Sequence, residues 1–156
     1  MVMGKIGEPR WEWLEIYYYS EPDQPAIECP VVWEERTGSK YCIVNNKTDW
    51  NTAKETCTSM RAHLVALETN DEDTWVYERL GYHSSNGMGS EWWSGGTDAA
   101  SEGTFYWDHS GDPLVFTKWD DGDPSGGTTE NCALLLVHYN WQDYPCFEKH
   151  NFICEK

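Results

Sequence analysis

Residues 119–143 read WDDGDPSGGTTENCALLLVHYNWQD, and they hold the clearest structural signal in the chain. A glycine-rich loop leads into an unbroken apolar run from Cys132 to Val137. The run has the length of a buried strand and is short for a helix. Carboxylates flank it at Asp123, Glu130 and Asp143. We therefore predict a buried strand beside a long polar loop, and loops of this length usually carry function.

A hairpin and a helix are predicted upstream of this stretch. Cys29–Trp33 and Lys40–Val44 flank a polar turn, which predicts two paired strands. A helix follows, capped by Thr48 or Asp49, because apolar residues then recur at spacings of three and four. Those apolar residues are Trp50, Ala53, Cys57 and Met60.

A strand and a second helix come next along the chain. Ala62–Leu67 is apolar enough to form a strand. A helix should begin near Thr69 or Asn70, since Asp71–Asp73 crowd the position of its first turn. Two helices followed by several short strands predict an α+β domain.

The N-terminal segment differs from the rest in composition and patterning, so we divide the chain into an extension (1–28) and one domain (29–156). Trp11–Tyr19 is aromatic and β-prone, which predicts a strand. Ser20–Pro25 contains two prolines, which predict a linker. Heptads and internal repeats do not occur in the sequence, so oligomerisation is possible but not indicated.

The charge balance argues against two classes of partner. The 156 residues include 11 Lys and Arg against 27 Asp and Glu, a formal net charge of −16. Such a chain repels phosphate backbones and anionic lipid, so we expect neither nucleic acid nor membrane as a partner. No run approaches the ~20 apolar residues of a membrane span. An acidic surface suits cations, although acidity also keeps an aromatic-rich protein soluble.

The cysteines indicate the compartment. There are six, with no CxxC pair and no zinc-type spacing, which favours disulfides and a secreted, extracellular protein. Asn46 lies in an acceptor sequon and is a candidate glycosylation site. The N-terminus lacks the apolar core of a signal peptide, so we expect none in this chain. Spacing alone leaves many disulfide pairings open.

Several motifs, taken in order, carry a resemblance to a known family. They are Trp50–Cys57, Ala62–Glu68, Glu91–Asp98, Glu102–Trp107, Trp119–Asp123, Glu130–Cys132, Trp141–Asp143 and Phe152–Glu155. Over Cys29–Cys154 the chain resembles the long form of the C-type lectin-like domain, in the version found in secreted arthropod and other invertebrate lectins.

This resemblance implies a fold and a disulfide pattern. The fold is α+β, with two helices, two small antiparallel sheets and a long calcium-binding loop region. The implied disulfides are Cys29–Cys42, Cys57–Cys154 and Cys132–Cys146.

The resemblance also assigns a principal calcium (Ca²⁺) site to the long loop and the segment after the buried strand. Its ligands match Asp123, Ser125, Glu130, Gln142 and Asp143, and Pro124 matches a cis-proline. In lectins of the family the same side chains bind sugar hydroxyls, so these five residues are the carbohydrate-binding candidates as well. Oxygen ligands of this kind are those that calcium prefers.

The triplet that selects the sugar departs from both common versions. It reads Asp123-Pro124-Ser125, where mannose-type members have Glu-Pro-Asn and galactose-type members have Gln-Pro-Asp. Ser125 is a shorter and weaker ligand than an amide or a carboxylate, and Gln142 stands where Asn is usual. An acid precedes the proline as in the mannose type, and no aromatic in residues 126–129 could stack on galactose. We therefore expect mannose-type rather than galactose-type recognition.

The resemblance implies an auxiliary calcium position as well. Asp98, Glu102 and Asn131 match its ligands, with Glu130 shared between the two positions. Gly126 supplies no side chain where another acid is usual. The alternative is that Asp98 and Glu102 are solvated loop acids.

Taken together, these features predict a secreted, calcium-dependent carbohydrate-binding protein with a glycan or glycoprotein ligand, in a role such as innate recognition of surface glycans. The alternative is a lectin-like domain that has lost sugar binding and recognises a protein, a mineral or an ice surface. We expect no enzyme, because no nucleophile or oriented base accompanies the acidic pairs. Asp120-Asp121 is interpreted as a solvated loop edge, and the tryptophans as core residues.

Overall fold

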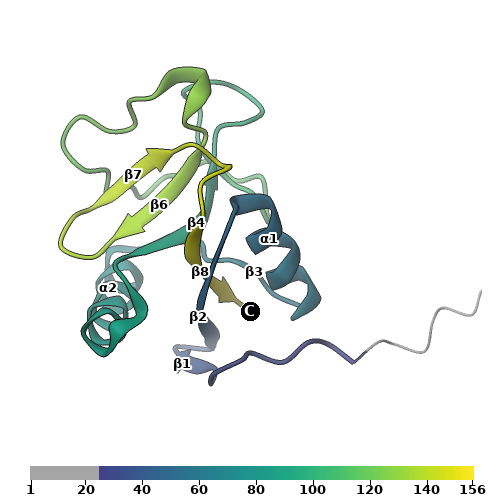
Figure 1. Ribbon diagram of the computed structural model, residues 1–156. Coiled ribbons are helices and arrows are strands. Elements are labelled where there is room, and N and C mark those ends of the chain that lie inside the picture. The colour runs from purple at the N-terminus through teal and green to yellow at the C-terminus, as the bar shows by residue number, and fades with distance from the viewer. Residues whose placement is uncertain (1–24) are drawn as a thin grey trace, which may run out of the picture.

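The computed structural model describes residues 25–156 (Figure 1). The strand expected at Trp11–Tyr19 and nearly all of the linker after it lie outside the described residues. In chain order the elements are β1 (Glu34–Arg36), β2 (Ser39–Thr48), α1 (Trp50–Ser59), β3 (His63–Leu64), α2 (Asn70–His83), η1 (Ser84–Met88), β4 (Glu91–Thr97), β5 (Tyr106–Trp107), η2 (Gly127–Thr129), β6 (Cys132–Leu136), β7 (Trp141–Tyr144) and β8 (His150–Glu155).

The strands form one sheet with the central order β1-β2-β8-β4-β6-β7, while β3 pairs with β8 and β5 pairs with β4. β4 and β8 run parallel, with Trp92 opposite Asn151 and Trp93 opposite Phe152. Every other pairing among the described strands is antiparallel. The two small antiparallel sheets that the resemblance implies are therefore two halves of one sheet, joined where β4 meets β8.

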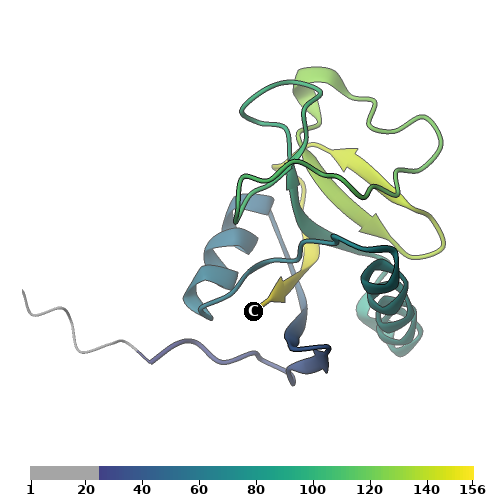
Figure 2. The same cartoon turned by 180° about the vertical axis from the view of Figure 1, so that it is seen from behind.

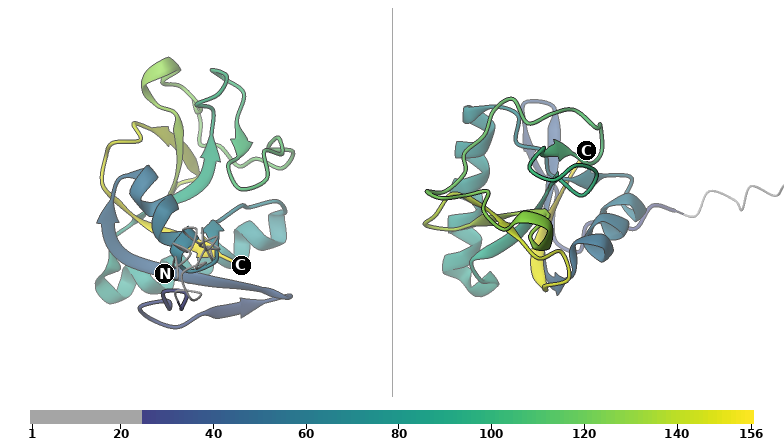
Figure 3. Two further views of the ribbon diagram at one scale, coloured as in Figure 1. Left: turned by 90° about the vertical axis from the view of Figure 1, so that its right-hand side faces the viewer. Right: turned by 90° about the horizontal axis from the view of Figure 1, so that it is seen from above.

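The helices flank the central strands on opposite sides (Figures 2 and 3). The connection 98–131 gathers at one end of the molecule, away from β1. This long connection contains most of the predicted site residues, so the sheet and helices act as the rigid support of a loop region. Within residues 25–156, no helix is long and apolar enough to span a membrane.

Both predicted helices form, with the caps that the sequence indicates. Asp49 caps α1 by accepting a hydrogen bond from the backbone N–H of Thr52 (2.9 Å). Thr69 caps α2 by accepting one from the backbone N–H of Glu72 (3.2 Å). Each cap satisfies a donor that the first turn of a helix leaves without an intrahelical partner. Local sequence alone therefore fixes where both helices begin.

The hairpin starts later than the sequence predicts. Its first strand is β1 at Glu34–Arg36, and Cys29–Trp33 is not a strand. Pro30 cannot donate a ladder hydrogen bond. Val31 and Val32 are 55% and 66% exposed, so their apolar character does not mark a buried strand.

The strand predicted for Ala62–Leu67 is also shorter in the structure, where it covers only His63–Leu64. The segment changes partner at the next residue. The N–H of Val65 donates to the carbonyl of Ile153 in β8 (3.0 Å), while the carbonyl of Val65 accepts from the N–H of Gly95 in β4 (2.9 Å). The chain crosses from one half of the sheet to the other, which ends the ladder.

The disulfides pair as the resemblance implies: Cys29–Cys42, Cys57–Cys154 and Cys132–Cys146. None of the described cysteines is free. Cys57–Cys154 joins α1 to β8 across a sequence separation of 97 residues. In the loop-entropy account, closing a loop of about 100 residues contributes about 4–5 kcal/mol.

Trp141, at the start of β7, is the centre of the aromatic core and is fully buried. Its ring packs edge-on against Trp107, Phe116 and Trp119, at centroid distances of 5.8 Å in each case. Its indole N–H donates to Oδ1 of the buried Asp73 in α2 (2.8 Å). These tryptophans therefore pack in or against the core, as predicted.

Lys118 completes this anchor and fixes the start of the site loop. Its ammonium group pairs with the other oxygen of Asp73 (3.2 Å). Its carbonyl accepts from the N–H of Trp141 (2.9 Å), and the N–H of Asp120 donates to the carbonyl of Trp141 (2.8 Å). The loop that begins at Asp120 is therefore held beside β7.

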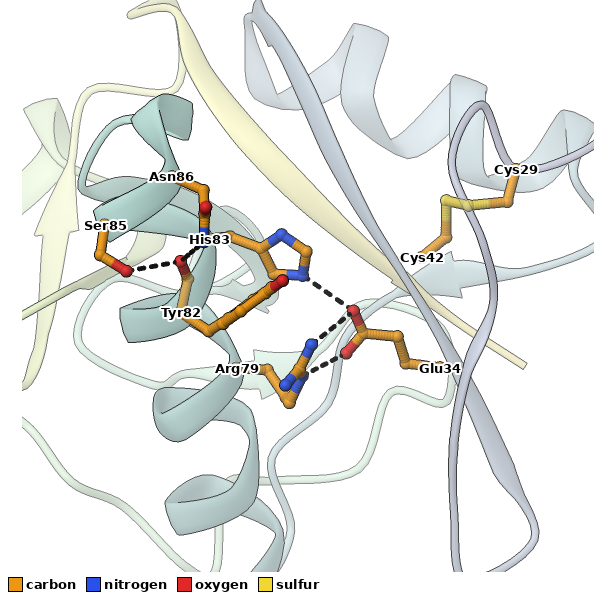
Figure 4. A network of polar contacts seen from close by, with 8 residues as sticks. All are labelled: Cys29, Glu34, Cys42, Arg79, Tyr82, His83, Ser85 and Asn86. Atoms are coloured by element: carbon orange, nitrogen blue, oxygen red, sulfur yellow. Dashed lines mark hydrogen bonds and ion pairs between the residues drawn. A yellow bond between two sulfur atoms is a disulfide. The ribbon is translucent and has the colours of Figure 1, made fainter.

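A polar network joins the hairpin to the last turns of α2 (Figure 4). Glu34 in β1 accepts two hydrogen bonds from Arg79, at 2.6 and 3.2 Å, and lies 2.8 Å from Nε2 of His83. Burial alone would raise the pKa of Glu34, but its bonds to Arg79 and His83 hold the pKa below the ordinary value. The network therefore stabilises the ionised form of Glu34 and binds β1 to α2.

Replacing Glu34 tests this network. Glu34→Gln removes the charge that Arg79 and His83 face, so it should lower the melting temperature by about 3–6 °C, or about 1–2 kcal/mol. Glu35→Gln is the matched control, because Glu35 is 69% exposed and its salt bridge is to the exposed Lys40. Equal shifts for the two variants in differential scanning calorimetry would contradict a structural role for the network.

Candidate functional site

Asp143 joins β7 to the long loop. Its carboxylate, 4% exposed, accepts hydrogen bonds from the backbone N–H of Ser125 at both oxygens (2.8 and 2.9 Å). It also accepts one from the N–H of Gly126 (2.9 Å). The Asp123–Pro124 peptide bond just before these residues is cis, the isomer that the resemblance implies. The triplet Asp123-Pro124-Ser125 is thereby held against the strand.

Two further carboxylates face Asp143 from the loop. Asp123 accepts a hydrogen bond from the hydroxyl of Ser125 (3.1 Å). Burial raises the pKa of Asp123, and the Asp143 carboxylate raises it further against the opposing effect of that hydroxyl. Burial and the charges of Asp143 and Asp123 also raise the pKa of Glu130. The structure thus brings together three of the predicted carboxylates. No cationic side chain among the described residues lowers the pKa of Asp123 or Glu130.

Glu130 lies directly across the backbone of Gly126. A Cβ atom on Gly126 would sit 1.8 Å from Oε2 and 2.3 Å from Cβ of Glu130, which no real contact allows. The absence of a side chain at Gly126 is therefore what lets Glu130 approach the loop. In the sequence, Gly126 stands out only as a position without the usual acid, and its packing against Glu130 leaves no local signal there.

Gln142 bonds to an acid outside the predicted ligand set. Its amide N–H donates to Oδ2 of Asp120 (2.9 Å). Asp120 was interpreted as part of a solvated loop edge, but it is only partly exposed and holds this bond, whereas its neighbour Asp121 is exposed. This contact between β7 and the loop leaves no local signal in the sequence, so the partial burial of Asp120 could not be predicted.

The predicted auxiliary residues form a second oxygen-rich group. Asp98 is 2% exposed; one of its oxygens accepts from the N–H of Gly103 (2.9 Å). The carbonyl of Asn131 accepts from the N–H of Asp98 (3.2 Å), and its side-chain N–H₂ donates to the carbonyl of Thr128 (3.3 Å). Glu102 is exposed, as the alternative interpretation expects; partial desolvation and then the nearby charges of Asp98 and Asp143 raise its pKa. Asp98 is therefore not the solvated loop acid of the alternative interpretation.

Two oxygen atoms of this group make the fit to a cation specific. Oδ1 of Asp98 and Oδ1 of Asn131 are buried and have no hydrogen-bond partner among the described residues. A buried acceptor left without a donor costs about 1–3 kcal/mol, so such atoms call for a partner. Calcium accepts carboxylate and amide oxygens of this kind. The auxiliary residues therefore fit calcium, because two of their oxygen atoms have lone pairs that accept no hydrogen bond.

The principal residues fit calcium in type, but their present contacts compete with it. Three carboxylates and a hydroxyl lie in one place, which suits calcium. Yet Asp143 already accepts three backbone hydrogen bonds. Among residues 25–156, no group of three or more His, Cys, Asp or Glu side chains is arranged to hold a metal ion as it stands. Asn46, the glycosylation candidate, is exposed in β2.

Comparison with known proteins identifies the fold. The family model described as the lectin C-type domain matches residues 46–156. Perlucin from Haliotis laevigata is 30% identical over 132 residues, covering 82% of this chain and 83% of perlucin. The carbohydrate-recognition domain of the mouse scavenger receptor C-type lectin superposes with a TM-score of 0.73 at 30% identity, covering 82% of this chain and 95% of that one.

Two further solved structures are similar. A Ca²⁺-dependent type II antifreeze protein in its Ca²⁺-free form has a TM-score of 0.71 at 28% identity, covering 82% of this chain and 99% of that one. The complex of SPL-1 with GlcNAc has a TM-score of 0.68 at 27% identity, covering 84% of this chain and 96% of that one. One fold thus serves a sugar-bound protein and an antifreeze protein.

The repulsion among the carboxylates can be tested without any ligand. Because the pKa of Glu130 is raised in the folded state, the unfolded state releases that proton first, and stability falls as pH rises above the ordinary value of 4.5. Glu130→Gln removes this penalty. In chelator, the variant should gain stability over the wild type between about pH 4 and pH 7, measured by urea unfolding.

Asp121→Asn is the control for this experiment, because Asp121 is an exposed acid of the same loop. A difference between Glu130→Gln and wild type that does not change with pH would show that no repulsion acts on Glu130.

Proposed function

This chain belongs to the C-type lectin domain family, and from that premise we propose that it is a secreted protein that binds glycans through calcium. The binding region is the loop 120–131 together with Gln142 and Asp143 in β7. The observation that carries the proposal is the proximity of Asp123, Glu130 and Asp143; partial desolvation and then mutual repulsion raise the pKa of the first two. A divalent cation would remove that repulsion. The family is generally non-enzymatic, which agrees with a binding role.

Each residue of the principal group has a role in this proposal. Asp123, Glu130 and Asp143 would supply charge to the ion, with the Ser125 hydroxyl and the Gln142 carbonyl as neutral ligands. Bound calcium would hold two sugar hydroxyls in its coordination shell. The carboxylates, whose oxygens accept hydrogen bonds, would orient those hydroxyls. The acid before Pro124 is the reason to expect mannose-type selection.

A second ion would occupy the auxiliary group. Asp98, Glu102 and Asn131 would bind it, and Glu130 would contact both positions. The support is that Oδ1 of Asp98 and Oδ1 of Asn131 are buried without a partner within the described part of the chain. An ion there would also neutralise charge beside Asp143, which contributes to the raised pKa of Glu102.

Further support comes from the pairing of the cysteines and from similar proteins. Three disulfides form within one domain, as expected in an oxidising, extracellular compartment. SPL-1, at 27% identity, is solved with GlcNAc. A sugar ligand for this chain is the natural extension, and Asn46, which is exposed, would be accessible to a glycosylating enzyme.

The alternative function is recognition of a protein, mineral or ice surface without sugar. One observation favours it: three backbone hydrogen bonds to Asp143 hold the loop against β7 without any ion. The small side chains of Asp123 and Ser125 also favour this alternative, because they are weaker sugar ligands than the residues usual in the triplet. The similarity to a type II antifreeze protein shows that this fold also serves a different kind of ligand.

Calcium should stabilise the folded protein. At ~10 mM calcium and a dissociation constant typical of extracellular sites, the melting temperature should rise by about 3–8 °C relative to chelator. Asp143→Asn should abolish most of this shift, whereas Asp121→Asn, a neutralised acid on the same loop, should retain it. A shift of undiminished size in Asp143→Asn would place the ion outside the principal group.

Sugar binding should depend on calcium and on the mannose-type arrangement of hydroxyls. The protein should be retained on immobilised mannose in calcium, and EDTA or free mannose should elute it while free galactose does not. Glu130→Gln should pass through unretained. Passage of the wild-type protein through mannose, galactose and N-acetylglucosamine resins alike would favour the alternative function.

A further inference from the structure

A cavity of about 380 Å³ lies between the segment that precedes α2 and the connection that follows β5. Its lining includes Glu68, Trp107, Asp112, Pro113, Val115 and Phe116. None of these residues belongs to either candidate calcium group. The volume is within the range of about 300–1,000 Å³ that is usual for small-ligand sites. The cavity is therefore large enough for a small ligand that is distinct from calcium and its sugar.

Apolar side chains form much of the lining. The ring of Trp107 packs against Trp141 at a centroid distance of 5.8 Å, and Phe116 packs against the same ring at 5.8 Å. Val115, which lines the cavity beside them, is 92% exposed. A carbon chain that covers Val115 would remove apolar surface from water, and this removal favours binding.

The connection that carries most of the lining is held by backbone hydrogen bonds. The N–H of Trp107 donates to the carbonyl of Asp112 (2.9 Å), and the N–H of Gly111 donates to the carbonyl of Trp107 (2.8 Å). The N–H of Asp108 donates to the carbonyl of Gly95 in β4 (2.9 Å). A ligand therefore meets a preformed surface, and its binding orders little of the chain.

Two carboxylates stand at this cavity without a partner. Among residues 25–156, the carboxylates of Glu68 and Asp112 have no hydrogen bond and no ion pair, although the backbone N–H of each residue is bonded. The neighbouring Asp108 differs, because its carboxylate pairs with the ammonium group of Lys54 (2.9 Å). The negative charge at the cavity is therefore not neutralised from within the described part of the chain.

A pair of histidines explains why no internal cation serves these carboxylates. The rings of His63 in β3 and His109 are stacked, with centroids 3.8 Å apart and planes 9° from parallel. Two protonated rings at that distance would repel each other. Partial desolvation and then the neighbouring His63 lower the pKa of His109 below its ordinary value of 6.5. The opposing charges are those of Glu68, Asp112 and Asp108. His109 is therefore mostly neutral at pH 7.

The polar groups of the cavity match a positively charged ligand that donates hydrogen bonds. Apart from the indole of Trp107, the polar side chains of the lining are two carboxylates, which accept and do not donate. An anion would be repelled, and sugar hydroxyls would find few donors. A bare metal ion fits poorly, since within residues 25–156 no three His, Cys, Asp or Glu side chains are arranged to hold one. A primary ammonium group has three donors and no acceptor, which matches this lining.

We infer that this cavity binds a primary ammonium ion carried on an apolar chain. The ammonium group bonds to Glu68 and Asp112, and the carbon chain covers Val115 and Phe116. Free alkylamines and the lysine side chains of a polypeptide share this chemistry. Binding here needs neither calcium nor sugar, so the inference goes beyond the proposed function and does not rest on it.

The test uses hexylamine as the probe. It would be titrated at pH 7 in EDTA into the isotope-labelled full chain, with binding followed by two-dimensional NMR. The indole N–H of Trp107 and the backbone N–H groups of Asp112 and Val115 should shift together. Hexylamine should bind about tenfold more tightly than hexanol, which has the same carbon chain without the charge. Hexanoate, with the opposite charge, should not bind.

Neutralising the carboxylates should remove this preference. Glu68→Gln and Asp112→Asn should each weaken hexylamine binding about three- to tenfold and leave hexanol binding unchanged. Glu78→Gln is the matched control, because Glu78 is an exposed acid of α2 outside the lining. All three side chains are exposed, so each variant should keep the wild-type melting temperature.

His109 offers a second, independent variant pair. His109→Lys places a permanent cation beside the two carboxylates and should weaken hexylamine binding by a similar factor. His109→Gln adds no charge and should bind hexylamine as the wild type does. Equal hexylamine affinity in these two variants would contradict the part assigned to the free carboxylates.

A lysine derivative distinguishes the two sources of the ammonium group. Binding of Nα-acetyl-lysine methylamide at the same residues would extend the ligand to polypeptide lysines. Its exclusion, with hexylamine bound, would restrict the site to free amines.

Three results would overturn the inference. Hexanol binding as tightly as hexylamine would make the cavity an apolar pocket without charge selection. Hexylamine binding that is unchanged in both Glu68→Gln and Asp112→Asn would reduce it to general attraction by the net charge of −16. The third result is no shift at about 10 mM hexylamine, a concentration that would reveal a millimolar dissociation constant.

Discussion

The hydrogen bond from the indole of Trp141 to the buried carboxylate of Asp73 is the contact on which the site geometry depends. Asp73 also pairs with Lys118, so one side chain of α2 holds both the start of the site loop and the start of β7. The carboxylates that face one another come from these two segments. Loss of Asp73 would leave a buried indole N–H without an acceptor and would release the loop as well. The helix thus positions a site to which it contributes no ligand.

The site is a place of unrelieved negative charge. Asp123 and Glu130 are partly exposed, and partial desolvation and then the charge of Asp143 raise their pKa values; Asp143 itself accepts hydrogen bonds from the loop backbone. A cation would compete for the same carboxylate. Binding of a cation would therefore neutralise these charges and also rearrange the contacts of residues 123–131.

Features with a local cause were predictable from the sequence, and those with a long-range cause were not. The caps Asp49 and Thr69 gave the helix starts because capping is set within four residues. The cysteine pairs came only from the family resemblance. The late start of β1, the bond from Gln142 to Asp120 and the Glu34–Arg79–His83 network all join distant segments, which no periodicity records.

Equilibrium dialysis of calcium tests the central claim most directly. The chelator-stripped protein would be dialysed at pH 7 against radioactive calcium, with and without saturating mannose. One or two ions should bind per chain, with dissociation constants of about 10⁻⁴–10⁻³ M. Calcium should bind more tightly when the sugar is present, because the coupling between the two ligands must be reciprocal. No bound calcium at ~10 mM free ion, or calcium affinity unaltered by any sugar that binds, would contradict it.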